Sequence, residues 1–324
     1  MSRPVEVLYI GGSGRSGSTI LARTLGRSPG FFDAGELWQL WDRGLLRNEL
    51  CGCGEPFGSC PFWTAVGREA FGGWQNVDAE RMASFKPLLR RARYLPHHAA
   101  FAGAGVRTRQ VRELLGVLGP VLERLYGALR EVSGARVIVD SSKRFSYTAV
   151  LCALPRVEVY AVHLVRDSRA VAHSWSRGKA RPEAAGGEGS RMPRQGPAKV
   201  ARMWNVQNLL HGLLPRSGVR SFARLRYEDF VRDPAPRLGE TLRGLGLEAD
   251  LGFIRGREVP LSRGHTVSGN PARFENGSVV LRPDEAWRER MRARDVALVT
   301  ALTAPFLAGY GYPLGAGRGE GCFS

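Results

Sequence analysis

The chain has 324 residues, 43% of them hydrophobic, so it can bury a large core and is not a disordered tail. Its 47 Lys and Arg against 30 Asp and Glu give a formal net charge of +17, which favours anionic ligands such as nucleotides, nucleic acid, sulfated sugars or an anionic surface. The basic residues are scattered, with no lysine-rich tail and no basic run interleaved with aromatics, so a nucleic-acid partner is not expected.

The first elements predicted along the chain are a buried strand, a glycine loop and a helix. Residues 5–10, VEVLYI, are the short β-branched apolar run expected of a strand in a parallel sheet. Residues 18–26 have apolar side chains at helical spacing, and the glycines lie between the two segments. Glycines let a ligand approach the backbone, and the amides at a helix start attract an anion. We therefore expect a phosphate site here rather than a plain turn.

The loop has the spacing of a P-loop but lacks its lysine. Four residues separate Gly12 from Gly17, and Ser18 stands where an ATP-binding loop carries lysine. Arg15 can offer a planar guanidinium fork to a different anionic group. The other predicted ligand-binding residues of the loop are Ser16, Gly17, Ser18 and Thr19. The loop therefore predicts a nucleotide whose 5′ end is not a triphosphate.

Three of the five cysteines lie close together in CGCGEPFGSC, namely Cys51, Cys53 and Cys60. With His97 or His98 as a fourth ligand they could bind zinc, and otherwise they form a disulfide or line a glycine-rich turn. The spacing lacks paired CxxC motifs, so no metal is expected. Cys152 lies in an apolar helical context, where an ordinary buried thiol is expected.

Strand and helix patterns alternate along the rest of the chain. Helical patterns occupy residues 36–48, 61–71, 79–95 and 106–132, and β-branched apolar runs occupy residues 135–140, 157–165 and 219–227. This order predicts an α/β fold with a central parallel sheet flanked by helices on both faces. One domain is expected over residues 1–314, with a flexible substrate loop at 178–197 and a C-terminal tail at 315–324.

Polar residues follow each predicted strand, where ligands of open α/β sheets bind. Asp140 to Lys143, DSSK, follow the second strand, and Arg166 follows the third. Ser174 lies two helical turns after Arg166, so the pair offers a cation and a hydroxyl to a second, separate phosphate. One phosphate loop and one remote phosphate site together predict a nucleotide phosphorylated at both ends.

These motifs resemble those of the sulfotransferases that use 3′-phosphoadenosine 5′-phosphosulfate (PAPS). GRSGST resembles the family's 5′-phosphosulfate loop in the arginine form of the carbohydrate and tyrosylprotein branch, and LVRDSRAVAHSW resembles its 3′-phosphate motif. LRYEDFVRDP resembles a following segment whose tyrosine lies near the adenine. GHTVSGNPARF, followed by Asp284 and Trp287, resembles the C-terminal part of bacterial members. The ordered set covers most of the chain.

The resemblance implies roles for particular residues. The implied nucleotide-binding set is Arg15, Ser16, Gly17, Ser18, Thr19, Arg166, Ser174, Tyr227, Asn270 and Arg273. PAPS is the implied donor and adenosine 3′,5′-bisphosphate the implied product, with no metal required. Arg15 and Lys143 are the expected catalytic cations, although a solvated lysine at a helix start is an equal alternative for Lys143.

A base is needed for the proton of the acceptor. Related carbohydrate and tyrosylprotein enzymes place a glutamate shortly after the loop helix, which favours Glu36, with Asp33 as its nearest rival. The branch that acts on small phenols uses a histidine. His97 and His98 therefore stay open as candidates, whereas His163 and His173 are expected in the core or behind the site, and His265 is not assigned.

The expected acceptor is a hydroxyl or amine of a carbohydrate, lipid or secondary metabolite. The bias towards Arg, Gly and Ala suggests a bacterial source, and the absence of an export signal or membrane-length apolar run suggests a cytoplasmic protein. Oligomeric state is not predicted.

Two other functions compete with this interpretation. A P-loop kinase would use Asp140 as its metal ligand, but it would need lysine in place of Ser18. A non-catalytic binder of nucleotide or nucleic acid needs the positive charge alone.

Overall fold

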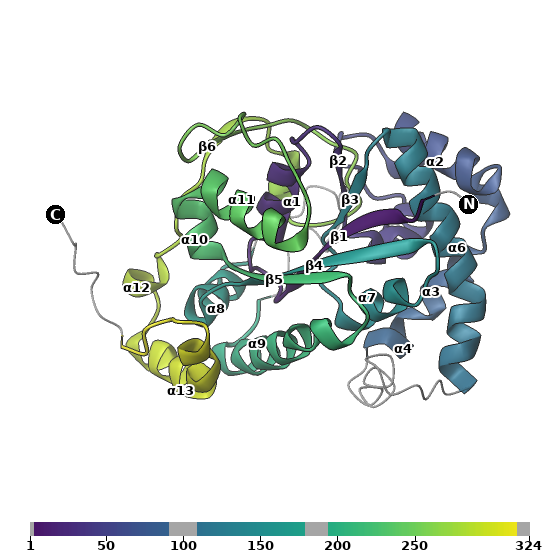
Figure 1. The fold of residues 1–324 in the computed structure, drawn as a ribbon. Helices are drawn as coiled ribbons and strands as arrows, with labels where there is room; N and C mark the ends of the chain where they lie inside the picture. The colour runs from purple at the N-terminus through teal and green to yellow at the C-terminus, as the bar shows by residue number, and fades with distance from the viewer. Residues whose placement is uncertain (1–2, 91–108, 179–193, 316–324) are drawn as a thin grey trace.

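A five-stranded parallel sheet forms the centre of the fold, with strand order β2-β3-β1-β4-β5 (Figure 1). The strands are β1 (Val5–Gly12), β2 (Phe31–Gly35), β3 (Val137–Asp140), β4 (Val157–Val165) and β5 (Ser221–Arg226). The computed structural model describes residues 3–90, 109–178 and 194–315 of the single domain. The predicted α/β fold with a parallel sheet flanked by helices is confirmed.

The helices follow the strands in the predicted alternation. The α-helices are α1 (Ser18–Leu25), α2 (Pro61–Phe71), α3 (Ala79–Ser84), α4 (Lys86–Arg90), α6 (Arg109–Ser133), α7 (Phe145–Cys152), α8 (Ser168–Ser176), α9 (Pro197–Gly212), α10 (Tyr227–Arg232), α11 (Pro234–Leu245), α12 (Trp287–Arg290) and α13 (Ala293–Gly309). Within these ranges no helix combines the length and the apolar composition needed to cross a bilayer.

Several short elements complete the fold. Helical turns other than α-helices are η1 (Leu37–Gln39), η2 (Leu40–Leu46), η3 (Phe57–Ser59), η4 (Trp74–Asn76), η6 (Leu214–Arg216) and η7 (Pro271–Phe274). A two-stranded antiparallel sheet joins β6 (Glu258–Leu261) to β7 (Gly277–Val280). This small sheet packs its apolar side chains against the same core as α1.

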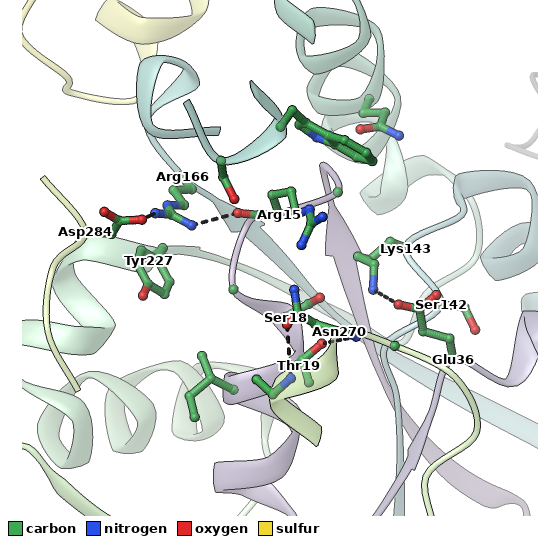
Figure 2. A pocket seen from close by; sticks show the side chains of 18 of the residues that line it. Arg15, Ser18, Thr19, Glu36, Ser142, Lys143, Arg166, Tyr227, Asn270 and Asp284 are labelled. Carbon is green, nitrogen blue, oxygen red and sulfur yellow. Dashed lines mark hydrogen bonds and ion pairs between the residues drawn. The ribbon is translucent and has the colours of Figure 1, made fainter. Parts of the chain in front are cut away.

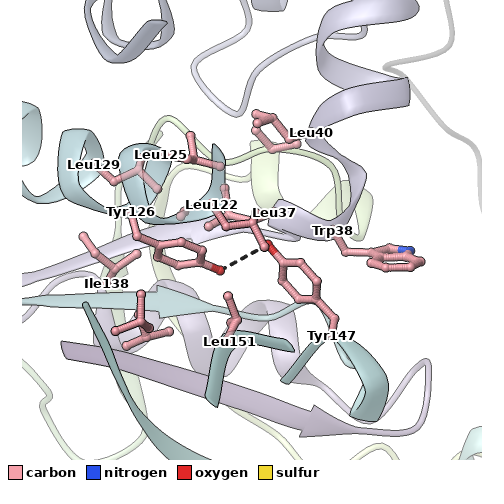
Figure 3. Packing of buried hydrophobic residues seen from close by; sticks show 14 of the residues in the cluster. Leu37, Trp38, Leu40, Leu122, Leu125, Tyr126, Leu129, Ile138, Tyr147 and Leu151 are labelled. Atoms are coloured by element: carbon pink, nitrogen blue, oxygen red, sulfur yellow. Dashed lines mark hydrogen bonds between the residues drawn. The ribbon is translucent and has the colours of Figure 1, made fainter. Parts of the chain in front are cut away.

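Alternating side chains of the central strands fill two separate cores. Val7 and Tyr9 of β1 face a cluster built with α2, α6 and α7, whereas Leu8 and Ile10 face a cluster built with α1, α10 and α11. Figure 3 shows the first cluster, in which leucines of α6 lie beside Leu37, Leu40 and aromatic side chains. Burial on both faces explains why the strand sequences are apolar throughout rather than alternating.

The predicted boundaries hold best where packing on both faces fixes them. The runs at 157–165 and 61–71 are β4 and α2 to the residue. Residues 36–48 are helical, but as the 3₁₀ turn η1 and the π-type turns of η2 rather than an α-helix. The pattern at 79–95 divides into α3 and α4 before the described part ends at residue 90. Most of the predicted substrate loop at 178–197, together with His97 and His98, lies outside the described residues.

A buried polar network links α6 to the end of β3. The Asp140 side chain is fully buried and accepts a hydrogen bond from the Tyr126 hydroxyl at 2.5 Å. Ser142 donates to the same carboxylate through its amide at 2.8 Å and through its hydroxyl at 2.5 Å. Burial raises the pKa of Asp140 to about 6, despite these donors. The network therefore fixes the turn that leads to Lys143.

We expect Tyr126→Phe to lower the free energy of unfolding by about 1–3 kcal/mol, because a buried carboxylate loses a donor. Denaturant titration measures the change. Tyr147→Phe is the matched control. The Tyr147 hydroxyl lies 3.4 Å from that of Tyr126, and among the described residues it donates no hydrogen bond to Asp140. We therefore expect a smaller loss of unfolding free energy in Tyr147→Phe. Equal losses in the two variants would contradict this role for Tyr126.

Candidate functional site

A cavity of about 780 Å³ opens where the glycine loop, the ends of β3 and β4 and the C-terminal segment meet. Figure 2 shows Arg15 between two ion pairs, Arg166 with Asp284 and Lys143 with Glu36. The sequence-predicted residues that line the cavity are Arg15, Gly17, Ser18, Thr19, Glu36, Lys143, Arg166, Ser174, Tyr227 and Asn270. The fold therefore brings together residues from nearly the whole length of the chain.

Two glycines of the loop occupy positions that admit no side chain. Gly12 has φ of 140°, and a Cβ there would lie 2.3 Å from the carbonyl oxygen of Leu164. Gly17 has φ of 94°, and its Cβ would lie 2.4 Å from the ring of Tyr227. Arg15 itself has φ of 72°, which is uncommon for a residue with a side chain. The loop is thus shaped by close contacts with β4 and α10.

The loop leads into α1 without a side-chain cap. Gly17 is the N-cap residue and has no side chain that could cap the first amides of the helix. Amides in this position favour an anion. Ser16 is fully buried, its amide donates to Ser13 O at 3.2 Å, and it does not line the cavity. Its contact with the nucleotide stays a prediction.

Arg166 is held by contacts with its neighbours on three sides. It donates to Arg15 O at 2.9 Å and to Asp284 Oδ2 at 3.0 Å, and its guanidinium lies 4.6 Å from the ring centroid of Tyr227. Its Nε atom is buried and has no hydrogen-bond partner among the described residues. Ser174, two turns into α8, lines the same cavity. This arrangement can hold a phosphate group in addition to the Asp284 carboxylate.

Two cationic side chains lie near each other at this end of the cavity. Burial lowers the pKa of Arg15 from its ordinary value, and the charge of Arg166 lowers it further. The guanidinium remains protonated, and it lies 5.0 Å from the ring centroid of Trp175. An anion bound between Arg15 and Arg166 would offset their mutual repulsion. The charge arrangement therefore favours an anionic ligand.

Glu36 and Lys143 form the second ion pair. Lys143 Nζ donates to Glu36 Oε1 at 2.6 Å and to Ser141 O at 2.8 Å. Burial alone raises the pKa of Glu36, but the Lys143 ammonium outweighs it and holds that pKa below its usual range. Glu36 is therefore a carboxylate at neutral pH, which is the protonation state that a base requires.

The C-terminal segment closes the cavity over α1. The Asn270 amide donates to Thr19 Oγ1 at 3.4 Å, and its side chain accepts from Ala272 N at 3.1 Å, capping η7. Arg23 of α1 donates to the carbonyl oxygens of Ala272, Glu275 and Ser262. Asn270 consequently lies at the cavity wall, and its contact with the nucleotide stays a prediction.

Arg273 differs in position from the other residues of the predicted nucleotide-binding set. Its side chain is buried and does not line the cavity. Nη1 donates to Thr266 O at 2.9 Å and Nη2 donates to Leu50 O at 2.7 Å, so the guanidinium joins two backbone segments. The motif pattern placed Arg273 near the site, but the backbone carbonyls already use its donors.

The rivals of Glu36 that the structure describes do not line the cavity, and His97 and His98 lie outside the described residues. Asp33 accepts a hydrogen bond from Gly35 N at 2.9 Å, within its own turn. His163 is fully buried in β4 against Asn208, with its Nε2 2.9 Å from Oδ1, and burial lowers its pKa to about 3. Among the described residues, no histidine lines the cavity. Glu36 is thus the candidate base that the fold supports.

Several cavity residues were not singled out from the sequence. They include Gln39, Arg43, Arg144, Trp175, Arg177, Gln195, Lys199, Met203 and Gln207. Trp175 directly follows Ser174, and Arg144 directly follows Lys143. Their position next to predicted site residues could therefore have indicated that they line the cavity. The residues of α9 carried no such signal, because they approach the cavity only through tertiary packing.

We expect Asp33 to contribute a loss of stability as pH rises from about 4 to 7. Burial raises the Asp33 pKa to about 7, against about 3.9 in an unfolded chain. In this window the unfolded carboxyl loses its proton while the folded one retains it, so each pH unit costs up to about 1.4 kcal/mol. Asp33→Asn should reduce this slope in denaturant titrations at several pH values.

Asp250→Asn is the matched control for this test. Exposed Asp250 accepts from Gly252 N at 2.8 Å, so it forms the same type of turn without the burial. An unchanged slope in Asp33→Asn, or an equal change in both variants, would refute the assignment.

Comparison with known proteins identifies the fold. No family model matches the chain, and no curated protein matches it. The sulfotransferase domain from the curacin biosynthetic pathway aligns over 96% of this chain and 100% of its own length, at 18% identity and a TM-score of 0.52. The sulfotransferase domain from the Synechococcus PCC 7002 olefin synthase aligns over 97% and 98%, at 19% identity and a TM-score of 0.49. The chain has the sulfotransferase fold, as its motifs predict.

Proposed function

We propose that the protein is a PAPS-dependent sulfotransferase. The proposal depends chiefly on one observation: a single cavity combines the lysine-free glycine loop, the Arg166 and Ser174 pair, and the Glu36 and Lys143 pair. The sulfotransferase fold supports it. The cavity residues fit a nucleotide phosphorylated at both ends. Buried Arg166 Nε has no partner among the described residues, and the Arg15 side chain lies between Arg166 and the Lys143–Glu36 pair.

Each end of the nucleotide has its own proposed set of residues. Arg15, the Ser18 and Thr19 hydroxyls and the amides at the start of α1 bind the 5′ end. Arg166 and Ser174 bind the 3′-phosphate, with Tyr227 beside Arg166. Asp284 accepts from Arg166 in the structure, so it fixes the guanidinium in place and neutralises part of its charge.

The donor supplies an activated sulfuryl group, whose bond to the 5′-phosphate oxygen breaks as the acceptor oxygen or nitrogen bonds to sulfur. Glu36 takes the proton that the acceptor loses. Lys143 and Arg15 stabilise the charge that develops on the leaving phosphate. Since Lys143 Nζ lies 2.6 Å from Glu36 Oε1, movement of Lys143 towards the phosphate would make Glu36 more basic at the moment when a base is needed.

The proposed acceptor is a hydroxyl or amine on a carbohydrate, lipid or secondary metabolite. The cavity extends past the ion pairs to polar side chains of η1 and α9, namely Gln39, Lys199 and Gln207, which can hydrogen-bond a polar acceptor. The cytoplasmic location and bacterial source stay predictions.

The kinase and simple-binder alternatives are less favoured. Asp140, the metal ligand that a P-loop kinase would need, is fully buried and its oxygens accept from Tyr126 and Ser142. Ser18 cannot replace the lysine that bridges phosphates in such enzymes. A simple binder would not need Glu36 paired with Lys143 inside the cavity.

Calorimetric titration with adenosine 3′,5′-bisphosphate in EDTA tests the donor site. We expect tight binding that depends on the 3′-phosphate, with ADP and AMP as controls that lack it. Arg166→Ala should weaken binding of the bisphosphate by about 10- to 100-fold and bring it close to ADP, because a charged hydrogen bond is lost. Arg220→Ala, an exposed pair with Glu158, is the matched control and should change nothing. No preference over ADP in the unmodified protein would reject the proposal.

Glu36→Gln tests the base. We expect turnover to fall by at least about 100-fold, since the amide cannot accept the acceptor proton, while binding of adenosine 3′,5′-bisphosphate is retained. Formation of that product from PAPS, measured over a panel of alcohols, phenols, sugars and amines, reports turnover. Full activity in Glu36→Gln would exclude Glu36 as the base.

A further inference from the structure

Four sulfur and nitrogen ligand atoms converge outside the cavity. They belong to Cys51, Cys53, Cys60 and His265, and all lie within 4.8 Å of one another. The sequence spacing predicts no metal, because it lacks a paired CxxC motif. The candidate fourth ligand in the sequence is His97 or His98. The structure instead brings in His265, which is remote in sequence and was not assigned.

The separations within the cluster suit tetrahedral coordination. The Sγ atoms of Cys53 and Cys60 are 3.7 Å apart. His265 Nδ1 lies 3.2 Å from Cys60 Sγ and 3.9 Å from Cys51 Sγ. A tetrahedral zinc ion with bonds of about 2.3 Å to sulfur and about 2.0 Å to nitrogen requires S···S near about 3.8 Å and S···N near about 3.6 Å. The other separations are at most 4.8 Å, so shifts of up to about 1 Å would bring all four atoms to those values.

The backbone around the cysteines forms a tight turn. Cys51 N donates to Glu55 O at 2.8 Å, and Gly54 N donates back to Cys51 O at 2.9 Å. Gly54 has φ of 101°, which permits the reversal that turns Cys51 and Cys53 towards the same point. Cys60 is the N-cap residue of α2, and its Sγ lies 3.7 Å from Cys53 Sγ and 3.2 Å from His265 Nδ1. Its sulfur is therefore available to the cluster.

His265 is held in place by aromatic packing. Its ring stacks on Phe62 with centroids 4.9 Å apart and an interplanar angle of 10°. Phe62 in turn stacks on Phe32 of β2 at 4.7 Å. Cys51 and Cys60 are buried, whereas Cys53 and His265 are partly exposed, so an ion can enter from one side.

We propose that these four residues bind a structural zinc ion. Three thiolates and one imidazole are a ligand set that selects zinc, and four protein ligands leave no open position for catalysis. A disulfide is the competing use of these cysteines, but it would pair two and leave the third thiol and the imidazole without a role. The proposal does not depend on the sulfotransferase activity.

The ion would fasten the segment that closes the candidate active site. Gly52 N donates to Thr266 O at 3.0 Å, and Arg273 donates to Leu50 O and Thr266 O, so the same two segments already touch. Val267, two residues after His265, accepts from Glu36 N at 2.8 Å. Zinc would therefore stabilise the backbone on which the candidate base depends.

Metal content tests the proposal. The reduced full-length protein is loaded with zinc, washed with a weak chelator and analysed by mass spectrometry for metals. We expect about one zinc per chain in the unmodified protein, and less than about 0.1 in Cys60→Ser and His265→Ala. Cys152→Ser is the matched control, because Cys152 lies at the end of α7 and outside the cluster, and it should retain the ion.

Two measurements on the unmodified protein avoid variants that fail to fold. Cobalt(II) in place of zinc should give the intense visible absorption of tetrahedral thiolate coordination. A strong chelator should lower the unfolding midpoint by more than about 5 °C, and added zinc should restore it. Less than about 0.1 zinc per loaded chain, wild-type content in the two ligand variants, or a disulfide within the cluster of the freshly purified protein would overturn the proposal.

Discussion

The contact between Gly35 and Val267 is the constraint on which the site depends. Val267 N donates to Ala34 O at 3.0 Å, and Glu36 N donates to Val267 O at 2.8 Å, which extends the pairing at the end of β2. Gly35 has φ of 79°, and a Cβ there would lie 2.5 Å from Val267 O. Only glycine allows so close an approach. The contact places Glu36 on one side and the segment that contains Asn270 on the other, and His265 lies two residues before Val267.

Ion pairs offset the free-energy cost of burying two of the cations at this cavity. Buried cations are costly unless a counter-charge is near, and the fold supplies Asp284 to Arg166 and Glu36 to Lys143. Both carboxylates come from segments other than the one that holds their cation. Burial raises the pKa of Asp284, but Arg166 and Arg177 outweigh it and hold that pKa below its usual range. Arg166 and Lys143 are thus each paired with a carboxylate that holds them in position.

The sequence predicted those features that depend on local pattern. β4 was found to the residue because both faces of the strand are buried and its sequence is apolar throughout. β2 was missed because five residues that include Asp33 and Gly35 at the sheet edge give little signal. The glycine loop and Arg166 follow strands directly, and Ser174 lies two helical turns after Arg166, so position in the sequence located them. Tertiary contacts between remote segments determine where the Arg273 side chain points, how α9 comes to line the cavity and where His265 lies. No local sequence pattern records such contacts.

The contacts of Arg23, Asn270 and Asp284 also bear on how the chain acquires its site during synthesis. The glycine loop and α1 leave the ribosome first, whereas the carbonyl groups that accept from Arg23, the cap formed by Asn270 and the counter-charge Asp284 all lie beyond residue 260. A nascent chain that has formed β1 to β5 has all the strands of its central sheet but still lacks one wall of the cavity. Ligand recognition therefore becomes complete only near the end of translation, so a premature stop beyond β5 would leave the central sheet with an unfinished site.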